Sequence, residues 1–246
     1  MQKHLLIFLI IISFLACKNK SQQKSAAKVL SKAIAYAGGK KFDNSQISFD
    51  FRDKHYEVKR YKAAWMMSRS FQEDSNFIND VYTKEGFERK VNEQRIIVAD
   101  SMAFKYIESI NSVIYFALLP YKLNDAAVQK ERLGKEEIKG KVYFKIGVSF
   151  KKEGGGEDYQ DLFIYWFDVQ DYSLDYLAYS FQVNGGGMRF RKAYNERFVQ
   201  GIRFVDYVNF KPKSNQVKLE TLGQLFVKNE LEELSKIELD NIKVNL

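Results

Sequence analysis

Hydrophobic positions in the first half of the chain change their spacing twice, and each change predicts a different element. Apolar side chains recur every three or four positions over residues 25–37, which predicts a helix that stops at Gly38 and Gly39. A second helix is expected over residues 101–118, ending before Pro120. Between the two helices the spacing changes to every second position, which predicts strands over residues 47–51, 55–61, 64–71, 77–83, 87–91 and 94–98.

The second half of the chain repeats the alternation. Five further strands are expected, over residues 142–150, 161–168, 174–182, 188–194 and 202–211. A short helical segment is predicted within residues 219–234, and residues 236–244 could return as a last strand. This order predicts an α+β fold with a mainly antiparallel sheet, an N-terminal helix and a central helix.

The strand over residues 162–167 reads Leu-Phe-Ile-Tyr-Trp-Phe and is therefore apolar on both faces, so both faces must be covered. A strongly curved sheet, an unclosed β-barrel around helices or a ligand, would cover them. A thick conventional core is the open alternative. If the central helix covers a cavity instead, the candidate lining residues are Ile107, Ile110, Ile114, Phe163, Tyr165 and Trp166.

The N-terminus resembles a bacterial lipoprotein signal. Lys3 precedes an apolar run over residues 5–15, which is too short to span a bilayer. Leu15-Ala16-Cys17 follows and resembles a lipobox, in which the cysteine is lipidated after cleavage. Cys17 is the only cysteine of the 246 residues, so it has no disulfide partner. We therefore expect a signal peptide at 1–16, a lipidated Cys17 with a short tether at 17–24, and a single α+β domain at 25–246.

Charge and composition change this picture little. The formal net charge is +8, with the lysines and arginines scattered along the chain, so nucleic acid is not expected as a partner. Membrane attachment through Cys17 is expected, at the outer membrane facing the periplasm, with exposure on the cell surface as an open alternative. A lipid or acyl chain and an envelope protein are the other candidate partners.

Two glycine-rich segments are a second candidate binding site, in this case for an anion. Freed backbone N–H groups and nearby arginines could bind an anion, whereas hairpin turns use glycine for its positive φ angles. Both interpretations stay open for Gly154, Gly155, Gly156, Gly185, Gly186, Gly187, Arg189 and Arg191. We expect the two glycine loops to lie at the same end of the sheet.

No catalytic residue, metal ligand set or cofactor is predicted. The signature motifs of serine, cysteine and zinc hydrolases are absent from the sequence, and His55 is interpreted as a surface residue. The acidic residues near Gly154 to Gly156 do not follow the spacing of a calcium loop.

Two blocks of sequence resemble a family of Bacteroidetes-type lipoproteins of unknown function, namely NSVIYFALLPYKL at 111–123 and GIRFVDY at 201–207. The order of elements is more loosely similar to the LolA/LolB-like lipoprotein-carrier superfamily. That resemblance implies an unclosed β-barrel that holds acyl chains under helices. Binding or carrying a lipid or acyl chain is therefore the first hypothesis. The alternative is a non-enzymatic interaction module with a solid core that docks an envelope protein, and an enzyme acting on lipid or glycan ranks third.

Overall fold

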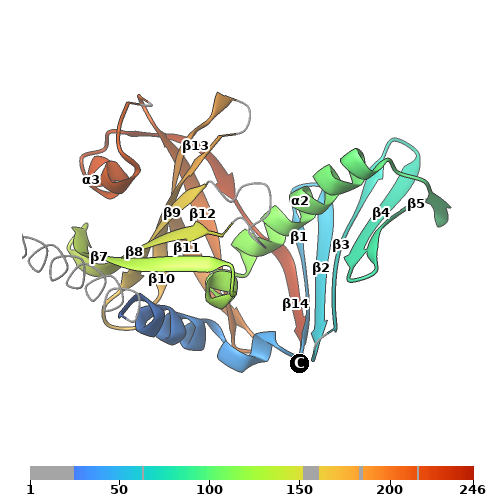
Figure 1. The fold of residues 1–246 in the computed structure, drawn as a ribbon, viewed down its shortest axis with the longest axis horizontal. Coiled ribbons are helices and arrows are strands. Elements are labelled where there is room, and N and C mark those ends of the chain that lie inside the picture. The colour runs from blue at the N-terminus through green and yellow to red at the C-terminus, as the bar shows by residue number, and fades with distance from the viewer. Residues whose placement is uncertain (1–24, 63, 152–160, 183–184, 215) are drawn as a thin grey trace, which may run out of the picture. The chain divides into compact units, whose positions relative to one another are not determined.

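A computed structural model describes residues 25–62, 64–151, 161–182, 185–214 and 216–246. Fourteen strands form two seven-stranded sheets in these residues (Figure 1). The β1–β6 sheet has the order β14-β1-β2-β3-β4-β5-β6, and the β7–β13 sheet has the order β13-β12-β11-β10-β9-β8-β7. The registered strand pairs are antiparallel. The predicted α+β class with curved, unclosed antiparallel sheet is confirmed, with the strands divided between two sheets.

The strands of the β1–β6 sheet are β1 (Ser45–Phe51), β2 (Lys54–Tyr61), β3 (Ala64–Glu73), β4 (Asn76–Thr83), β5 (Gly86–Val91), β6 (Gln94–Ile96) and β14 (Asp240–Asn245). Those of the β7–β13 sheet are β7 (Val128–Ile138), β8 (Lys141–Phe150), β9 (Leu162–Asp168), β10 (Leu174–Phe181), β11 (Gly187–Val199), β12 (Ile202–Pro212) and β13 (Leu231–Ile237). The helical elements are a helix over residues 25–37, η1 (Gly39–Phe42), α2 (Asp100–Ala117), η2 (Tyr121–Asn124), η5 (Leu219–Thr221) and α3 (Leu222–Val227).

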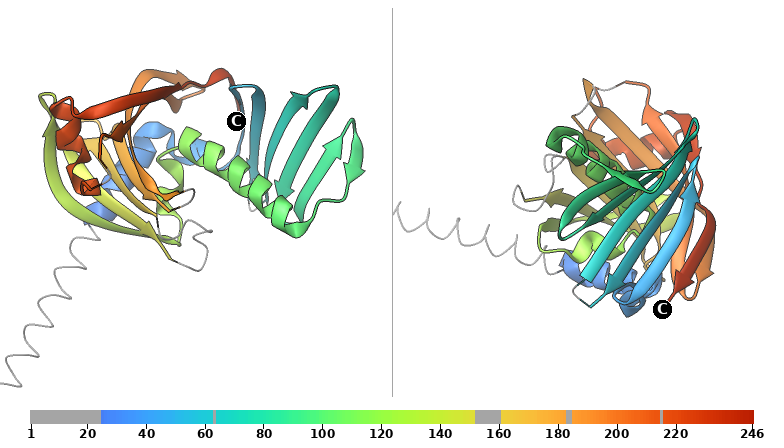
Figure 2. Two further views of the ribbon diagram at one scale, coloured as in Figure 1. Left: turned by 90° about the horizontal axis from the view of Figure 1, so that it is seen from above. Right: turned by 90° about the vertical axis from the view of Figure 1, so that its right-hand side faces the viewer.

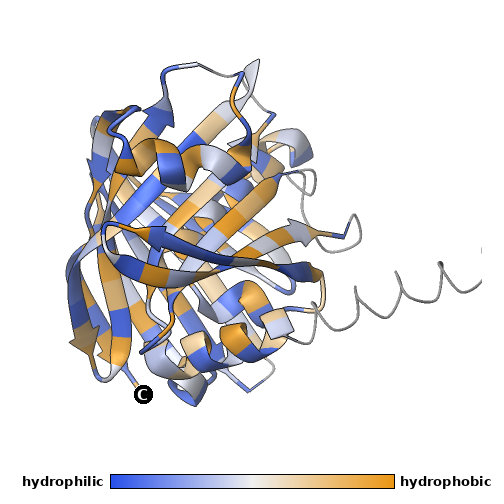
Figure 3. Cartoon of the chain, turned by 90° about the vertical axis from the view of Figure 1, so that its left-hand side faces the viewer, coloured by the Kyte–Doolittle hydropathy of each residue, from blue (hydrophilic) through white to orange (hydrophobic). Residues whose placement is uncertain are grey.

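Two strands of the structure were not predicted from the sequence. Strand β7 was not expected, because most of its residues are polar on both faces, as the hydrophilic colour along this strand in Figure 3 shows. The short helical segment predicted within residues 219–234 is confirmed as η5 and α3, whereas Leu231–Ile237 is strand β13, which was not predicted. Both β7 and β13 therefore form strands because they pair within a sheet, although their local sequence patterns do not indicate strands.

By contacts the chain divides into two compact units. The first unit holds the described parts of residues 1–33, 123–192 and 209–234, and the second holds residues 34–122, 193–208 and 235–246. The β1–β6 sheet and α2 lie entirely in the second unit, whereas β7 to β10, η5 and α3 lie in the first. The single domain expected at 25–246 stays a prediction.

In the first unit both faces of β9 are buried, as the sequence predicts. Ile164 and Trp166 point into a core closed by Leu222 and Phe226 of α3. Phe163 points to the opposite face, where its ring stacks on that of Tyr179 at 5.6 Å between ring centres. Aromatic rings therefore cover one face of this strand and a short helix covers the other.

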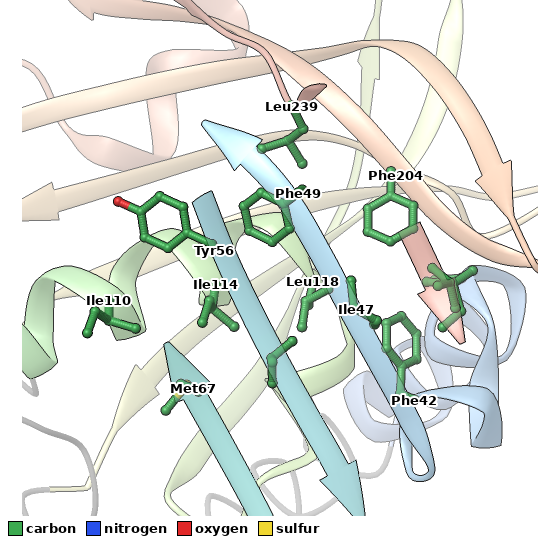
Figure 4. Packing of buried hydrophobic residues seen from close by; sticks show 14 residues of the cluster. Phe42, Ile47, Phe49, Tyr56, Met67, Ile110, Ile114, Leu118, Phe204 and Leu239 are labelled. Carbon is green, nitrogen blue, oxygen red and sulfur yellow. The ribbon is translucent and has the colours of Figure 1, made fainter. Parts of the chain in front are cut away.

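In the second unit α2 crosses one face of the β1–β6 sheet (Figures 1 and 2). The last turns of the helix bury Ile110 and Ile114 completely in a core that includes Tyr56 and Met67 of β2 and β3 (Figure 4). Alternation in the strands places these side chains on the face toward the helix. The amphipathic spacing of α2 thus closes the core of this unit.

Replacing Ile114 by alanine should lower the free energy of unfolding by about 2–5 kcal/mol, because the side chain is fully buried and leaves a cavity. The matched control is Ile97→Ala, since Ile97 is fully exposed and its loss should change stability by less than about 0.5 kcal/mol. Denaturant unfolding of both variants measures the difference. Equal stability of the two variants would contradict the packing of α2 on the sheet.

Candidate functional site

A pocket of about 550 Å³ lies between the first half of α2 and strands β5 and β6, and we name it the α2 pocket. Its lining is mainly aliphatic and aromatic, with four charged residues among it. The lining residues are Phe87, Glu88, Arg89, Arg95, Ile96, Ile97, Val98, Asp100, Ala103, Phe104 and Ile107. The volume is in the range of pockets that bind small molecules and single hydrocarbon chains.

Local sequence explains why these side chains meet. Ala103 and Ile107 are four residues apart, so they lie on the same face of α2. Arg89 of β5 stands opposite Ile96 of β6, so both point to one face of the sheet. A helix face and two adjacent strands therefore form the walls of the α2 pocket.

Exposed apolar side chains surround this pocket. Ile97 is fully exposed, and Ile96, Met102 and Phe104 are each exposed to between 38% and 40%. Isolated exposed apolar residues are ordinary on a protein surface, but a group of them beside a pocket marks a place that a ligand or another surface can cover. The mouth of the α2 pocket is thus unusually apolar.

The three isoleucines predicted to line a cavity have different positions along α2. Ile107 is half-buried and lines the α2 pocket. Ile110 and Ile114 are fully buried in the core beneath the second half of the helix. The helix therefore combines a pocket at its start with solid packing toward its end.

A buried ion cluster lies beside the pocket on the same face of the sheet. The carboxylate of Asp80 is fully buried and accepts hydrogen bonds from two guanidinium groups. Arg69 donates from Nε at 3.2 Å and from a terminal nitrogen at 2.5 Å, and Arg89 donates at 2.6 and 2.8 Å. Two cations thus share one anion, which leaves a formal charge of +1 in a buried place.

Neighbouring groups of α2 stabilise this charge in part. The Arg69 guanidinium also donates to the hydroxyl of Ser109 at 2.9 Å. The guanidinium of Arg89 lies over the ring of Tyr106, 3.7 Å from its centre, which is a favourable cation–π distance. The hydrogen bonds to Asp80 raise the pKa of Arg89, so this guanidinium stays charged.

The cluster was missed in the sequence, although a signal was present. Each of three predicted strands carries one charged residue at an inward, apolar position of the alternation: Arg69 lies between Met67 and Phe71, Asp80 between Ile78 and Tyr82, and Arg89 between Phe87 and Val91. Charges at successive inward positions of neighbouring strands indicate a buried ion pair network.

A second, smaller pocket of about 380 Å³ lies in the first unit, and we name it the β7–β9 pocket. Phe163 and Ile164 contribute to its lining, and half of the other lining residues are polar, among them Gln129, Ser149 and Glu220. Tyr165 and Trp166, the other two predicted cavity residues of this strand, are fully buried in packed structure. The indole nitrogen of Trp166 donates to Glu136 at 2.9 Å, which fixes this ring as part of the core.

The glycine loop at 185–187 forms the turn between β10 and β11. Gly185, Gly186 and Gly187 all have positive φ, and a Cβ on Gly186 would approach the carbonyl oxygen of Phe181 to 3.1 Å. Arg189 lies over the ring of Phe181, and Arg191 donates to the hydroxyl of Tyr179 at 2.9 Å. These contacts favour the hairpin interpretation, and the anion site at this loop stays a prediction.

Cys17 and Gly154, Gly155 and Gly156 lie outside the described residues, so lipidation and the shared position of the two glycine loops stay predictions. His55 is half-exposed on β2, with its Nδ1 2.6 Å from a carboxylate oxygen of Asp50. Within the described ranges no three His, Cys, Asp or Glu residues gather in a way that could hold a metal ion. Nor does any helix in that part of the chain have the length and hydrophobicity to cross a membrane.

Comparison with protein families matches residues 3–239 to DUF6503, described as a family of unknown function. The chain belongs to this family, which confirms the prediction of a family without an assigned activity. A search of curated proteins found no match.

Solved structures give a likeness of fold. A DUF1329 family protein from Desulfovibrio piger is 10% identical, with a TM-score of 0.50 over 90% of this chain and 93% of that chain. A LolA superfamily protein from Nitrosomonas europaea is 11% identical, with a TM-score of 0.49 over 89% of this chain and 92% of that chain. At these identities the likeness concerns the fold alone.

The ion cluster predicts a large effect of a single substitution. Asp80→Ala should lower the free energy of unfolding by about 3–5 kcal/mol, because it leaves two buried guanidinium groups without their anion. Asp53→Ala is the control, since Asp53 forms an exposed ion pair with Lys54 and should contribute less than about 1 kcal/mol. Urea unfolding measures both. A loss below about 1 kcal/mol for Asp80→Ala would show that the cluster is not a stabilising contact.

Proposed function

We propose that this protein is a membrane-anchored lipoprotein of the cell envelope that binds or carries a lipid or acyl chain, and that the α2 pocket is the binding site. The α2 pocket carries the proposal, because it combines a volume of about 550 Å³ with a mainly apolar lining and an apolar mouth. Each buried methylene contributes about 0.8 kcal/mol, so a chain of several methylenes would be held in such a pocket. Binding of this kind requires no catalytic group.

The location in the cell belongs to the same proposal. Cys17 would carry the covalent lipid, and residues 17–24 would link it to the rest of the chain. Several acyl chains on one cysteine anchor a protein firmly. We propose the outer membrane as the site of attachment, with the protein facing the periplasm.

An interaction module is the second candidate function. The complete burial of Ile110 and Ile114 favours it, because a solid core beneath the second half of α2 leaves no room for a ligand there. In that case the apolar surface around Ile97 and Phe104 would contact an envelope protein instead of a lipid. The two candidates differ in whether the α2 pocket takes up a hydrocarbon chain.

Filling the pocket distinguishes them. Ala103→Trp places an indole in the α2 pocket, where it would displace about four methylenes of a bound chain and weaken binding by about 3 kcal/mol, more than tenfold. The measurement is photolabelling of the purified full-length lipoprotein in amphipol by a C16 fatty acid with a diazirine at its methyl end. Labelling should fall at least tenfold.

Lys105→Trp is the matched control, because Lys105 lies exposed on the same helix and outside the pocket lining. Its labelling should stay within about twofold of the unaltered protein, and the melting temperatures of both variants show whether the fold is kept. Equal labelling of Ala103→Trp and Lys105→Trp would reject the α2 pocket as the binding site. No labelling of the unaltered protein would favour the interaction module.

The anchor is tested separately. Cys17→Ser removes the thiol that lipidation requires, so the protein should lose metabolic labelling by a clickable fatty acid and should no longer be processed to the lipid-modified form. Labelling of Cys17→Ser at the level of the unaltered protein would contradict the lipoprotein assignment.

A further inference from the structure

The four charged residues of the α2 pocket lining have no net formal charge, but they differ in their partners. Glu88 has two cationic partners, Arg95 at 3.3 Å and Lys90 at 3.6 Å. Asp100 lies in the first turn of α2, where the helix dipole favours a negative charge. The remaining charged group of the lining is Arg89, whose partner Asp80 is shared with Arg69. The excess positive charge of the cluster therefore faces the pocket through Arg89.

Arg89 also has unused hydrogen-bonding capacity. A guanidinium carries five N–H donors, and Arg89 uses its Nε and one terminal nitrogen for Asp80. Tyr106 is a further side-chain hydrogen-bond partner of Arg89, so these contacts leave two of the five N–H groups for a ligand. The side chain is only 11% exposed and forms part of the pocket lining. An anionic ligand would make charge-assisted hydrogen bonds with this guanidinium.

Asp80 offers Arg89 no further hydrogen bonds. Its two oxygens already accept four hydrogen bonds from Arg69 and Arg89, which is the usual capacity of a carboxylate. Tyr106 contacts the Arg89 guanidinium both with its ring and as a side-chain hydrogen-bond partner. An anion in the pocket could bind the remaining N–H groups of the guanidinium.

The polarity of the pocket fixes the orientation of such a ligand. The Arg89 side chain is only 11% exposed, whereas the apolar side chains of Ile97 and Phe104 are exposed. A molecule with one anionic end and one hydrocarbon end matches both parts. A neutral lipid would leave the excess positive charge of the cluster without an added anion, and a cationic one would be repelled.

We propose that the α2 pocket selects an anionic amphiphile, with the carboxylate or phosphate of its head group bound by Arg89 and its acyl chain leading out toward Ile97 and Phe104. This inference rests on the proposed function and adds the class of head group and its orientation. Either a fatty acid or a lipid with a phosphate monoester head group supplies the required chemistry.

The test compares probes that have the same hydrocarbon chain but different head groups. The purified full-length lipoprotein in amphipol is photolabelled by a C16 fatty acid and by the matching C16 alcohol, each with a diazirine at the methyl end. A charged hydrogen bond is worth about 1.5–3 kcal/mol, so the acid should label at least tenfold better than the alcohol. Unlabelled hexadecyl phosphate and palmitate are then compared as competitors, which identifies the preferred anion, and hexadecyltrimethylammonium should not compete.

Two variants connect the selectivity to Arg89. Arg89→Gln should abolish the preference, so that the acid and the alcohol label this variant equally. Arg89→Lys keeps the charge and should retain part of the preference for the acid. Lys105→Gln removes an exposed positive charge from α2 and should leave the preference unchanged.

The labelling results distinguish a failure of the head-group inference from a failure of the proposed acyl-chain binding. Equal labelling by acid and alcohol in the unaltered protein would overturn the head-group inference while leaving acyl binding intact. A preference for the acid that survives Arg89→Gln in a folded protein would also overturn it. Absence of labelling by both probes would reject the proposed function itself. If Arg89→Gln unfolds, the comparison of acid with alcohol in the unaltered protein still decides.

Discussion

Helix α2 lies across the inner face of the β1–β6 sheet, and the organisation of the second unit depends on how this one helix is seated. Toward its end the isoleucines at 110 and 114 fill the space above β2 and β3 completely. Toward its start a pocket of about 550 Å³ lies between the helix, where Ala103 has a small side chain, and strands β5 and β6. The same amphipathic spacing therefore provides both a rigid attachment and an open site.

A charged cluster inside such a core is costly unless its geometry is good. Removing charges from water costs several kcal/mol per ion, and only close hydrogen bonds offset it. Asp80 meets this condition by accepting from both arginines, yet one cation of the three groups remains in excess. An all-apolar replacement would pack the sheet as well, so stability alone does not account for the second arginine. The anion recognition that we propose for the adjacent pocket would give that residue a role.

Much of this fold could be predicted from the sequence, because the strict alternation over residues 47–98 and the helical spacing from Ala103 to Ile114 reflect burial on one face. Strand β7 could not, since an edge strand with polar residues on both sides has no such pattern. Strand β13 was obscured because Leu231 and Leu234 stand three residues apart, which also fits a helix. A pocket is harder to predict from sequence than a strand, because it forms where side chains do not fill the space between elements. Ile107 and Ile110 are the same residue type on one helix, but only Ile107 lines a pocket.

Native mass spectrometry of the full-length protein isolated from cells tests the central claim most directly. The account predicts a protein with its covalent acyl groups plus one noncovalently bound amphiphile, whose released fragment is an anion detected in negative-ion mode. A protein carrying only covalent acyl groups, isolated without delipidating detergent and still folded, would contradict the claim that the α2 pocket binds lipid.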